Sequence, residues 1–220
     1  RAVFDALGHD AQVILSDANR AVLLARTGKL AEAAELNASL VAKATQAEVT
    51  WLIGDISNHL ARNLIELDRP TEALEALDAQ DPETIEKAAA VQSAALRAKA
   101  LLATGRRAMA ARAAEDGLRL AAEAEMVAER AELYEMRGLS RVASRSGPRV
   151  AAAERDLAHA VALYLAAGLT EKARELSTRF LPSPGIHVRR GGGFLSDQPT
   201  LPLPEPKTER NESRAEPRND

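Results

Sequence analysis

A turn residue flanked by small residues at fixed distances recurs along the first 180 residues of the chain. The turn residues are 40, 37 and 42 positions apart. This pattern predicts helical hairpins, because Gly, and less readily Asp, adopts the left-handed conformation that ends a helix. Ala or Ser at the crossing lets the two helices approach closely. Each set consists of the turn residue, a small residue seven positions before it and another five positions after it: Ala21, Gly28 and Ala33; Ala61, Asp68 and Ala73; Ala98, Gly105 and Ala110; Ser140, Gly147 and Ala152.

Composition favours a nearly all-helical body followed by a tail of different character. Of the 46 Ala residues, 45 precede residue 181, and Ala and Leu are strong helix formers. The last 39 residues hold seven of the ten Pro residues and a GlyGlyGly run. We expect a frayed segment or the remnant of an upstream repeat at 1–10, a helical repeat domain at 11–181 and a disordered, Pro/Gly-rich and charged tail at 182–220.

The turns set the expected helix boundaries. Asp81 is expected to cap a helix that begins at Pro82, with Glu83 in its first turn. A further turn at Gly168 precedes a capping helix at 170–180. The four expected pairs span 11–26 and 30–45, 46–67 and 70–79, 82–104 and 108–124, and 126–144 and 149–167.

This register resembles the tetratricopeptide repeat, whose helix pair carries a small residue on the first helix, Gly at the turn and Ala on the second helix. The resemblance covers about residues 11 to 180. The period near 40 residues, longer than the family's roughly 34, is similar to the long-helix variants found in bacterial regulators. The family's repeated Trp and Tyr signature is missing. The resemblance implies an all-α fold, a right-handed α-solenoid of about four helix-turn-helix repeats with a C-terminal capping helix and a disordered tail.

Charge and motif content exclude several functional classes. A formal charge of −3 gives no domain-wide basic surface for nucleic acid, and no apolar run is long enough to cross a membrane. The chain has no Cys, and its four His residues are at least 28 positions apart. No phosphate-binding loop, zinc helix or nucleophile elbow occurs. We expect a cytoplasmic, non-enzymatic protein that has no cofactor or metal and binds neither nucleic acid nor membrane.

Three weaker motifs have plainer interpretations. Glu125, Glu129 and Glu132 share a helix face, which is typical of a solvated surface. The ArgArgGlyGlyGly run at 189–193 is typical of a flexible linker. The LeuProLeuPro run at 201–204 fits a linker better than a ligand for a polyproline-reading groove.

The family resemblance also implies a ligand-binding stripe on the first helix of each hairpin, at the positions thirteen, ten and six before the turn residue. The stripe begins apolar and becomes basic, and Arg145 would extend it by one turn. This arrangement favours an acidic peptide or a chain-terminal carboxylate, and Asn58 with Arg62 is similar in residue type to the family's carboxylate clamp. The alternative is a charged face that only keeps the domain soluble. The stripe comprises Leu15, Ala18 and Val22, followed by the candidate binding residues Asp55, Asn58, Arg62, Gln92, Lys99, Tyr134, Arg137 and Arg141, with Ala95 between Gln92 and Lys99.

The favoured function is a non-catalytic protein–protein interaction scaffold that binds a peptide or a partner helix in a polar, locally basic concave groove. An alternative is a sensor or regulatory arm of a larger bacterial signalling protein or transcription regulator, with an effector domain upstream. An enzyme on a helical scaffold is a third reading. It would need a buried cluster of titratable residues, and the sequence contains no such cluster.

Overall fold

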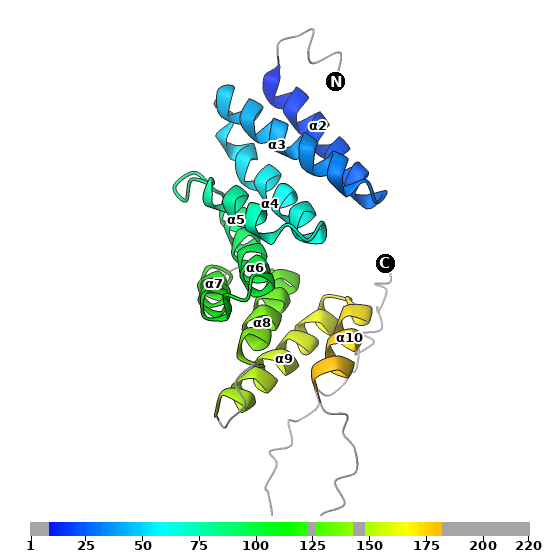
Figure 1. Ribbon diagram of the computed structural model, residues 1–220, viewed down its shortest axis with the longest axis vertical. Coiled ribbons are helices and arrows are strands. Elements are labelled where there is room, and N and C mark those ends of the chain that lie inside the picture. The colour runs from blue at the N-terminus through cyan, green and yellow to red at the C-terminus, as the bar shows by residue number, and fades with distance from the viewer. Residues whose placement is uncertain (1–8, 123–125, 143–147, 182–220) are drawn as a thin grey trace, which may run out of the picture. The chain divides into compact units, whose positions relative to one another are not determined.

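The computed structural model describes residues 9–122, 126–142 and 148–181, and every regular element in these ranges is an α-helix (Figure 1). The chain divides after Pro184 into two units, and the second unit, like the predicted tail at 182–220, lies outside the described residues. The all-α part of the predicted fold is thereby confirmed. The helices are α2 (Asp10–Arg26), α3 (Leu30–Gln46), α4 (Thr50–Glu66), α5 (Pro70–Asp78), α6 (Lys87–Ala103), α7 (Arg107–Leu120), α8 (Val127–Val142), α9 (Pro148–Ala166) and α10 (Thr170–Phe180).

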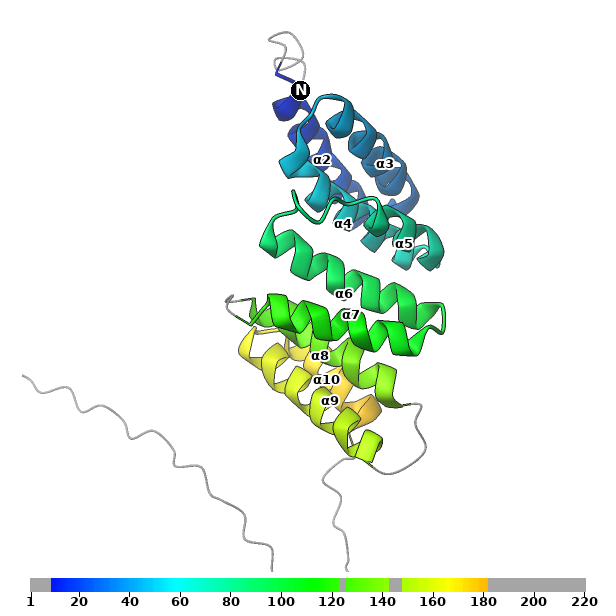
Figure 2. The ribbon, with the colours of Figure 1, turned by 90° about the vertical axis from the view of Figure 1, so that its left-hand side faces the viewer.

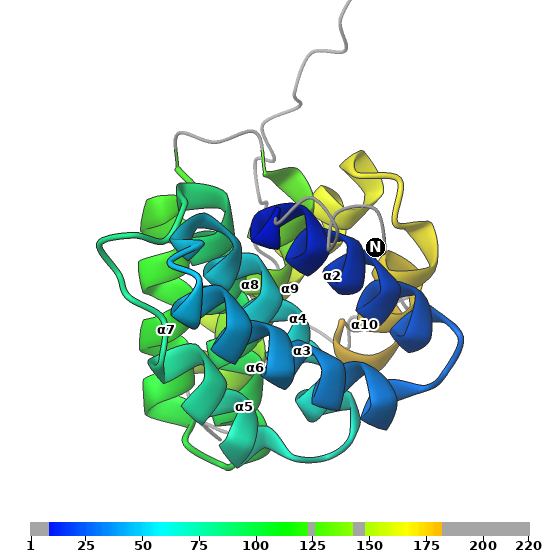
Figure 3. The same cartoon turned by 90° about the horizontal axis from the view of Figure 1, so that it is seen from above.

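Helix packing follows the order of the chain. Each helix contacts the next one, and α2, α4, α6 and α8 also contact one another in succession (Figures 1 and 2). Contacts of this second kind do not join α3, α5 and α7. Seen from above, α7 and α10 lie on opposite sides of the helical unit (Figure 3). The alternate helices α2, α4, α6 and α8 therefore form one continuous row. None of the helices in the described ranges has both the length and the apolar character needed to cross a bilayer.

The predicted turn residues adopt the predicted conformation. Gly28, Asp68, Gly105 and Gly168 have φ values of 81°, 58°, 75° and 75°, in the left-handed region. At each turn, the following residue donates its N–H to a carbonyl four residues before the turn residue, as in the bond from Lys29 to Leu24 of 2.9 Å. The same bond joins Arg69 to Leu64, Arg106 to Leu101 and Leu169 to Tyr164, each at 2.8 Å. This hydrogen bond closes the Schellman motif that ends a helix. Gly147 lies outside the described residues.

Two predicted helix starts are wrong. A further left-handed turn at Glu48, with φ of 55°, ends α3, so the helix predicted from Gln46 begins at Thr50. The helix predicted from Pro82 begins at Lys87. Asp81 Oδ1 does accept a hydrogen bond from the Glu83 N–H at 3.0 Å, and the Asp81 carbonyl accepts one from the Ile85 N–H at 3.2 Å. These bonds form a single turn that does not continue as a helix. The local cap is therefore present without the helix that it was expected to begin.

Close helix crossings occur at the predicted small residues in the first three pairs. The members of these sets on both helices, Ala21, Ala33, Ala61, Ala73, Ala98 and Ala110, are 0% exposed. In the fourth pair the predicted Ala152 is only half-buried. There α8 and α9 meet at Gly138, where an added Cβ would lie 2.8 Å from Leu157 Cγ and 3.3 Å from the Ala153 carbonyl oxygen. The tight position is thus two residues before the predicted Ser140, which is buried and whose Oγ donates to the Met136 carbonyl of its own helix.

This difference predicts that Gly138→Ala destabilises the protein. Overpacking costs about 1–3 kcal/mol and opposes a gain in helix propensity of up to about 1 kcal/mol. Leu157 Cγ is a branch point close to the backbone, so it cannot swing aside alone. We expect the unfolding free energy, measured by urea denaturation, to fall by roughly 1 kcal/mol or more. Ser140→Ala is the control and should change it by less than about 1 kcal/mol. A larger loss for Ser140→Ala than for Gly138→Ala would contradict the observed register.

Candidate functional site

Two adjoining hollows lie along the row of alternate helices. The α2–α4 hollow has a volume of about 600 Å³ and is lined by Ala21, Val22, Ala25, Arg26, Asn37, Asp55, His59, Arg62, Asn63, Glu66 and Gln92. The α6–α8 hollow has a volume of about 270 Å³ and is lined by Arg62, Glu66, Ala95, Leu96, Lys99, Glu132, Glu135, Met136 and Lys172. Arg62 and Glu66 belong to both hollows, so the two share a wall on α4.

Half of the predicted stripe lines these hollows. The structure brings Val22, Asp55, Arg62 and Gln92 together in the α2–α4 hollow, and it places Ala95 and Lys99 in the α6–α8 hollow. The remaining positions line neither hollow. They are Leu15, Ala18, Asn58, Tyr134, Arg137 and Arg141.

Asn58, predicted to contact a partner, instead links α4 to α6 inside the fold. Its side chain is 2% exposed, and its Nδ2 donates to the Ala89 carbonyl at 2.9 Å. Its Oδ1 accepts hydrogen bonds from Ser93 Oγ at 2.7 Å and from Gln80 Nε2 at 3.1 Å. Because these bonds occupy both ends of the amide, the predicted carboxylate clamp loses its Asn.

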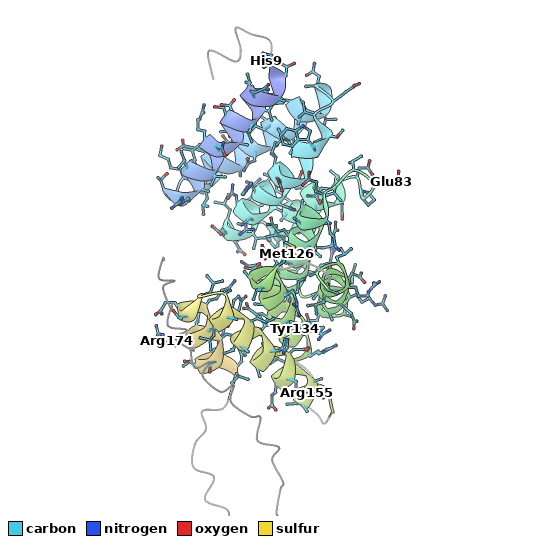
Figure 4. All side chains as sticks on the ribbon, turned by 180° about the vertical axis from the view of Figure 1, so that it is seen from behind. His9, Glu83, Met126, Tyr134, Arg155 and Arg174 are labelled. Carbon is cyan, nitrogen blue, oxygen red and sulfur yellow. The ribbon has the colours of Figure 1, made fainter. Side chains whose placement is uncertain are left out.

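Arg137 and Arg141, predicted to extend the basic groove, bind an acidic side chain of the next helix. Arg137 Nη2 lies 2.7 Å from Asp156 Oδ1, and Arg141 Nη1 pairs with Asp156 Oδ2. Burial opposes the charge on Arg137, yet its hydrogen bond to Asp156 raises the pKa of the guanidinium above its ordinary value. Tyr134 contacts His159 of α9, with ring centroids 4.3 Å apart, near the α8–α9 boundary (Figure 4). Tyr134, Arg137 and Arg141 therefore join α8 to α9. Arg145, the predicted extension of the stripe, lies outside the described residues.

The register at Gly138 explains this difference. In the second pair the stripe residues lie six before, three before and one after the crossing residue Ala61. The same offsets from Gly138 give Glu132, Glu135 and Leu139, and the two Glu residues do line the α6–α8 hollow. A Gly inside an otherwise helical segment was the signal that sequence reasoning missed.

Internal contacts occupy the charged residues at the α8 end of the hollows. Lys172 Nζ bonds to Glu132 Oε1 at 2.7 Å, and the Tyr164 hydroxyl donates to Glu135 Oε2 at 2.5 Å. Burial and the neighbouring Glu135 raise the pKa of Tyr164, which keeps the phenol protonated as a donor. Arg62 and Lys99, by contrast, form no ion pair with any carboxylate in the described part of the chain.

His59 lies half-buried in the α2–α4 hollow between opposite charges. Burial lowers its pKa below the ordinary value, Arg62 lowers it further, and Asp55 acts in the opposite direction. The imidazole is therefore neutral at neutral pH and offers one donor and one acceptor to the hollow.

Among the described residues, no group of three or more His, Asp or Glu side chains is placed to hold a metal ion. Compared with protein-family models, curated proteins and solved structures, the chain has no significant match in any of the three.

Because Asp156 is buried and pairs with two Arg residues, removal of its charge should lower the unfolding free energy strongly. Asp156→Asn keeps the shape of the side chain but leaves two Arg residues with reduced compensation, so the unfolding free energy should fall by roughly 2–3 kcal/mol. The matched control is Asp78→Asn. Asp78 pairs with Arg97 but its side chain is 65% exposed, so its removal should cost about 0–1 kcal/mol. Equal losses in chemical denaturation would show that the Asp156 pairs contribute no more than surface pairs.

The lowered pKa of His59 predicts a pH dependence of stability. On acidification the unfolded chain takes up the proton first, so stability falls as the pH drops below the unfolded value of about 6.5. His59→Gln should reduce this loss. The measurement is the difference between the Tm at about pH 7.5 and at about pH 5.5, where most carboxylates remain ionised. An unchanged difference in the variant would exclude His59 as its source.

Proposed function

We propose that the helix pairs are repeats of a right-handed α-solenoid similar to the tetratricopeptide repeat. The recurring left-handed turns, the buried Ala crossings and the successive contacts of α2, α4, α6 and α8 support this arrangement. In stacked helical hairpins, the second helix of one hairpin typically packs against the first helix of its own hairpin and of the next one. The contacts of α3 with α2 and α4 follow this pattern.

On this scaffold, the two hollows form a binding surface for an extended peptide, and the protein acts as a non-catalytic interaction module. The observation that carries this proposal is that Asp55, Arg62, Gln92 and Lys99, four positions of the stripe that the family resemblance implies, line two hollows that share a wall. Adjoining hollows along a row of helices suit a ligand that crosses several repeats.

Arg62 and Lys99 determine the charge that this surface prefers. They occupy the same position in successive pairs, six residues before Asp68 and Gly105. Glu132 is already bound by Lys172, and Glu135 accepts from Tyr164. Arg62 and Lys99 form no ion pair within the described residues, although Glu66 lines both hollows, and the two cations can therefore bind a carboxylate of the peptide. A hydrogen bond to a charged group contributes about 1.5–3 kcal/mol, enough for a clear effect on affinity.

Peptide selection followed by charge reversal tests the proposal. A random-peptide display library is panned on the full chain, and the Kd of each enriched peptide is measured by fluorescence anisotropy. We expect enriched peptides to carry an acidic residue or to bind through a free carboxyl end. The double variant Arg62→Glu/Lys99→Glu should weaken binding at least about tenfold, with unchanged helicity by circular dichroism.

The control reverses two charges elsewhere. Arg112→Glu/Arg119→Glu changes the net charge equally on the exposed surface of α7, which lies at the edge of the helical unit (Figure 3). Its Kd should equal that of the unmodified chain. Failure to enrich any peptide, or equal affinity of the Arg62→Glu/Lys99→Glu variant, would contradict the proposed function.

A further inference from the structure

The buried Asn residues of the helical unit fall into two kinds. Asn58 is 2% exposed and is hydrogen-bonded at both ends of its amide. Asn37 and Asn63 are 1% and 4% exposed, and within the described residues Asn37 Oδ1, Asn37 Nδ2 and Asn63 Nδ2 have no hydrogen-bond partner. Buried polar atoms are nearly always bonded, so these three need an explanation.

Both unpartnered amides occupy positions at which the pair that follows has a buried apolar residue. Asn37 lies nine residues after the turn at Gly28, where the next two pairs have Leu77 and Ala114, both buried. Asn63 lies five residues before the turn at Asp68, where the following pair has Ala100, which is 0% exposed. The fold thus accepts an apolar side chain at either position, and the two Asn residues do not follow from helix packing.

The two Asn residues belong to the lining of one hollow. Asn37 comes from α3 and Asn63 from α4, and both line the α2–α4 hollow together with His59 and Arg62. Asn58, the fully bonded Asn of the same helix, lines neither hollow. Both Asn residues with unpartnered amide atoms therefore line the surface that we assign to peptide binding.

We propose that the α2–α4 hollow is a subsite for an amide group of the bound peptide, with Asn37 and Asn63 as its hydrogen-bond partners. The inference rests on the proposed function and assigns a ligand chemistry to one part of that surface. Asn37 presents both a donor and an acceptor, which match the C=O and N–H of an amide. A carboxylate would leave Asn37 Oδ1 unsatisfied, and an ammonium group would leave both Nδ2 groups unsatisfied.

The surrounding charges agree with an uncharged ligand group. The hollow contains Asp55 and Glu66 as well as Arg26 and Arg62, so neither sign prevails. The amide can come from the peptide main chain or from an Asn or Gln side chain, and small probes distinguish these two sources.

The first test uses the isotope-labelled full chain and the side-chain NH₂ signals of its Asn residues in NMR spectra. N-acetylalanine N-methylamide carries main-chain amides only, N-acetylglutamine N-methylamide adds a side-chain carboxamide, and sodium acetate carries a carboxylate. Signals are assigned from their loss in Asn37→Ala, Asn63→Ala and Asn58→Ala. We expect the Asn37 and Asn63 signals to shift when an amide probe is added. The Asn58 signal should shift much less with the same probe, and acetate should shift the Asn37 and Asn63 signals much less than the amide probe does.

A response to both amide probes identifies the main chain as the source, whereas a response to the Gln probe alone identifies a side chain. No shift with either amide probe, or an equal shift with acetate, would overturn the inference. Because these probes do not require Arg62 or Lys99, this result is independent of the charge-reversal experiment that tests the proposed function.

The second test compares stability with peptide affinity. Asn37→Leu and Asn63→Ala introduce the residues found at the equivalent positions, and Asn37→Ala covers the case in which Leu is too large. Removal of an unpartnered buried amide should raise the Tm, by about 2–4 °C, and should weaken binding of the selected peptide at least about tenfold. Asn58→Ala, which breaks satisfied bonds, should lower the Tm. A Tm loss in the Asn37 and Asn63 variants as large as that of Asn58→Ala would show a structural role and overturn the inference.

Discussion

The left-handed residue at the end of each helix is the constraint on which the rest of this structure depends. Because an α-helix turns by about 100° per residue, the position at which it stops determines which side chains face the next helix. Lys29, Arg69, Arg106 and Leu169 each donate to a carbonyl of the preceding helix, and this bond fixes the chain direction after the turn. The buried Ala residues seven before and five after the turn then meet. The stripe positions are counted from the same turn, so their direction relative to this crossing is fixed as well.

This dependence explains how much of the fold the sequence could predict. Where a Gly or a Pro-flanked Asp marks the turn, as at Gly28, Asp68, Gly105 and Gly168, the helix ends were predicted within about two residues. Glu48 carries no such signal, since a Glu seldom adopts positive φ, and its turn was missed. The Asp81 cap was recognised, but the helix after it begins only at Lys87. Between them Ile85 packs against Gly54, a contact between distant parts of the chain. Local chemistry can predict a cap, whereas tertiary packing decides whether a helix continues from it.

The same limits apply to the candidate site. Arg62 and Lys99 could be predicted because they share one offset from turns that the sequence marks clearly. Asn58 also lies at a stripe position, yet it is buried and accepts hydrogen bonds from Ser93 and Gln80. These two partners lie outside α4, so no pattern within that helix indicates the contact. Arg137 and Arg141 were predicted wrongly for two reasons. The stripe assumed a helix crossing at Ser140, whereas the close crossing lies at Gly138, and Asp156, which pairs with both Arg residues, belongs to the next helix. A stripe counted on one helix identifies candidates for exposure, but charges on neighbouring helices decide which candidates remain available to a partner.

Together the two hollows suggest a direction for the bound peptide. At the α8 end, the Lys172–Glu132 and Tyr164–Glu135 bonds satisfy the charged groups internally. Arg62 and Lys99 in the middle of the row are cations that form no ion pair in the described part of the chain. The α2–α4 hollow provides amides amid charges of both signs. A ligand with a carboxylate followed by an uncharged amide would satisfy these groups only when the carboxylate lies toward α6 and the amide toward α2. The reverse orientation would place the carboxylate in a hollow where Asp55 and Glu66 offset Arg26 and Arg62, and it would leave Lys99 without a partner. Specificity on this surface would then depend on the order of polar groups along the peptide as much as on their number.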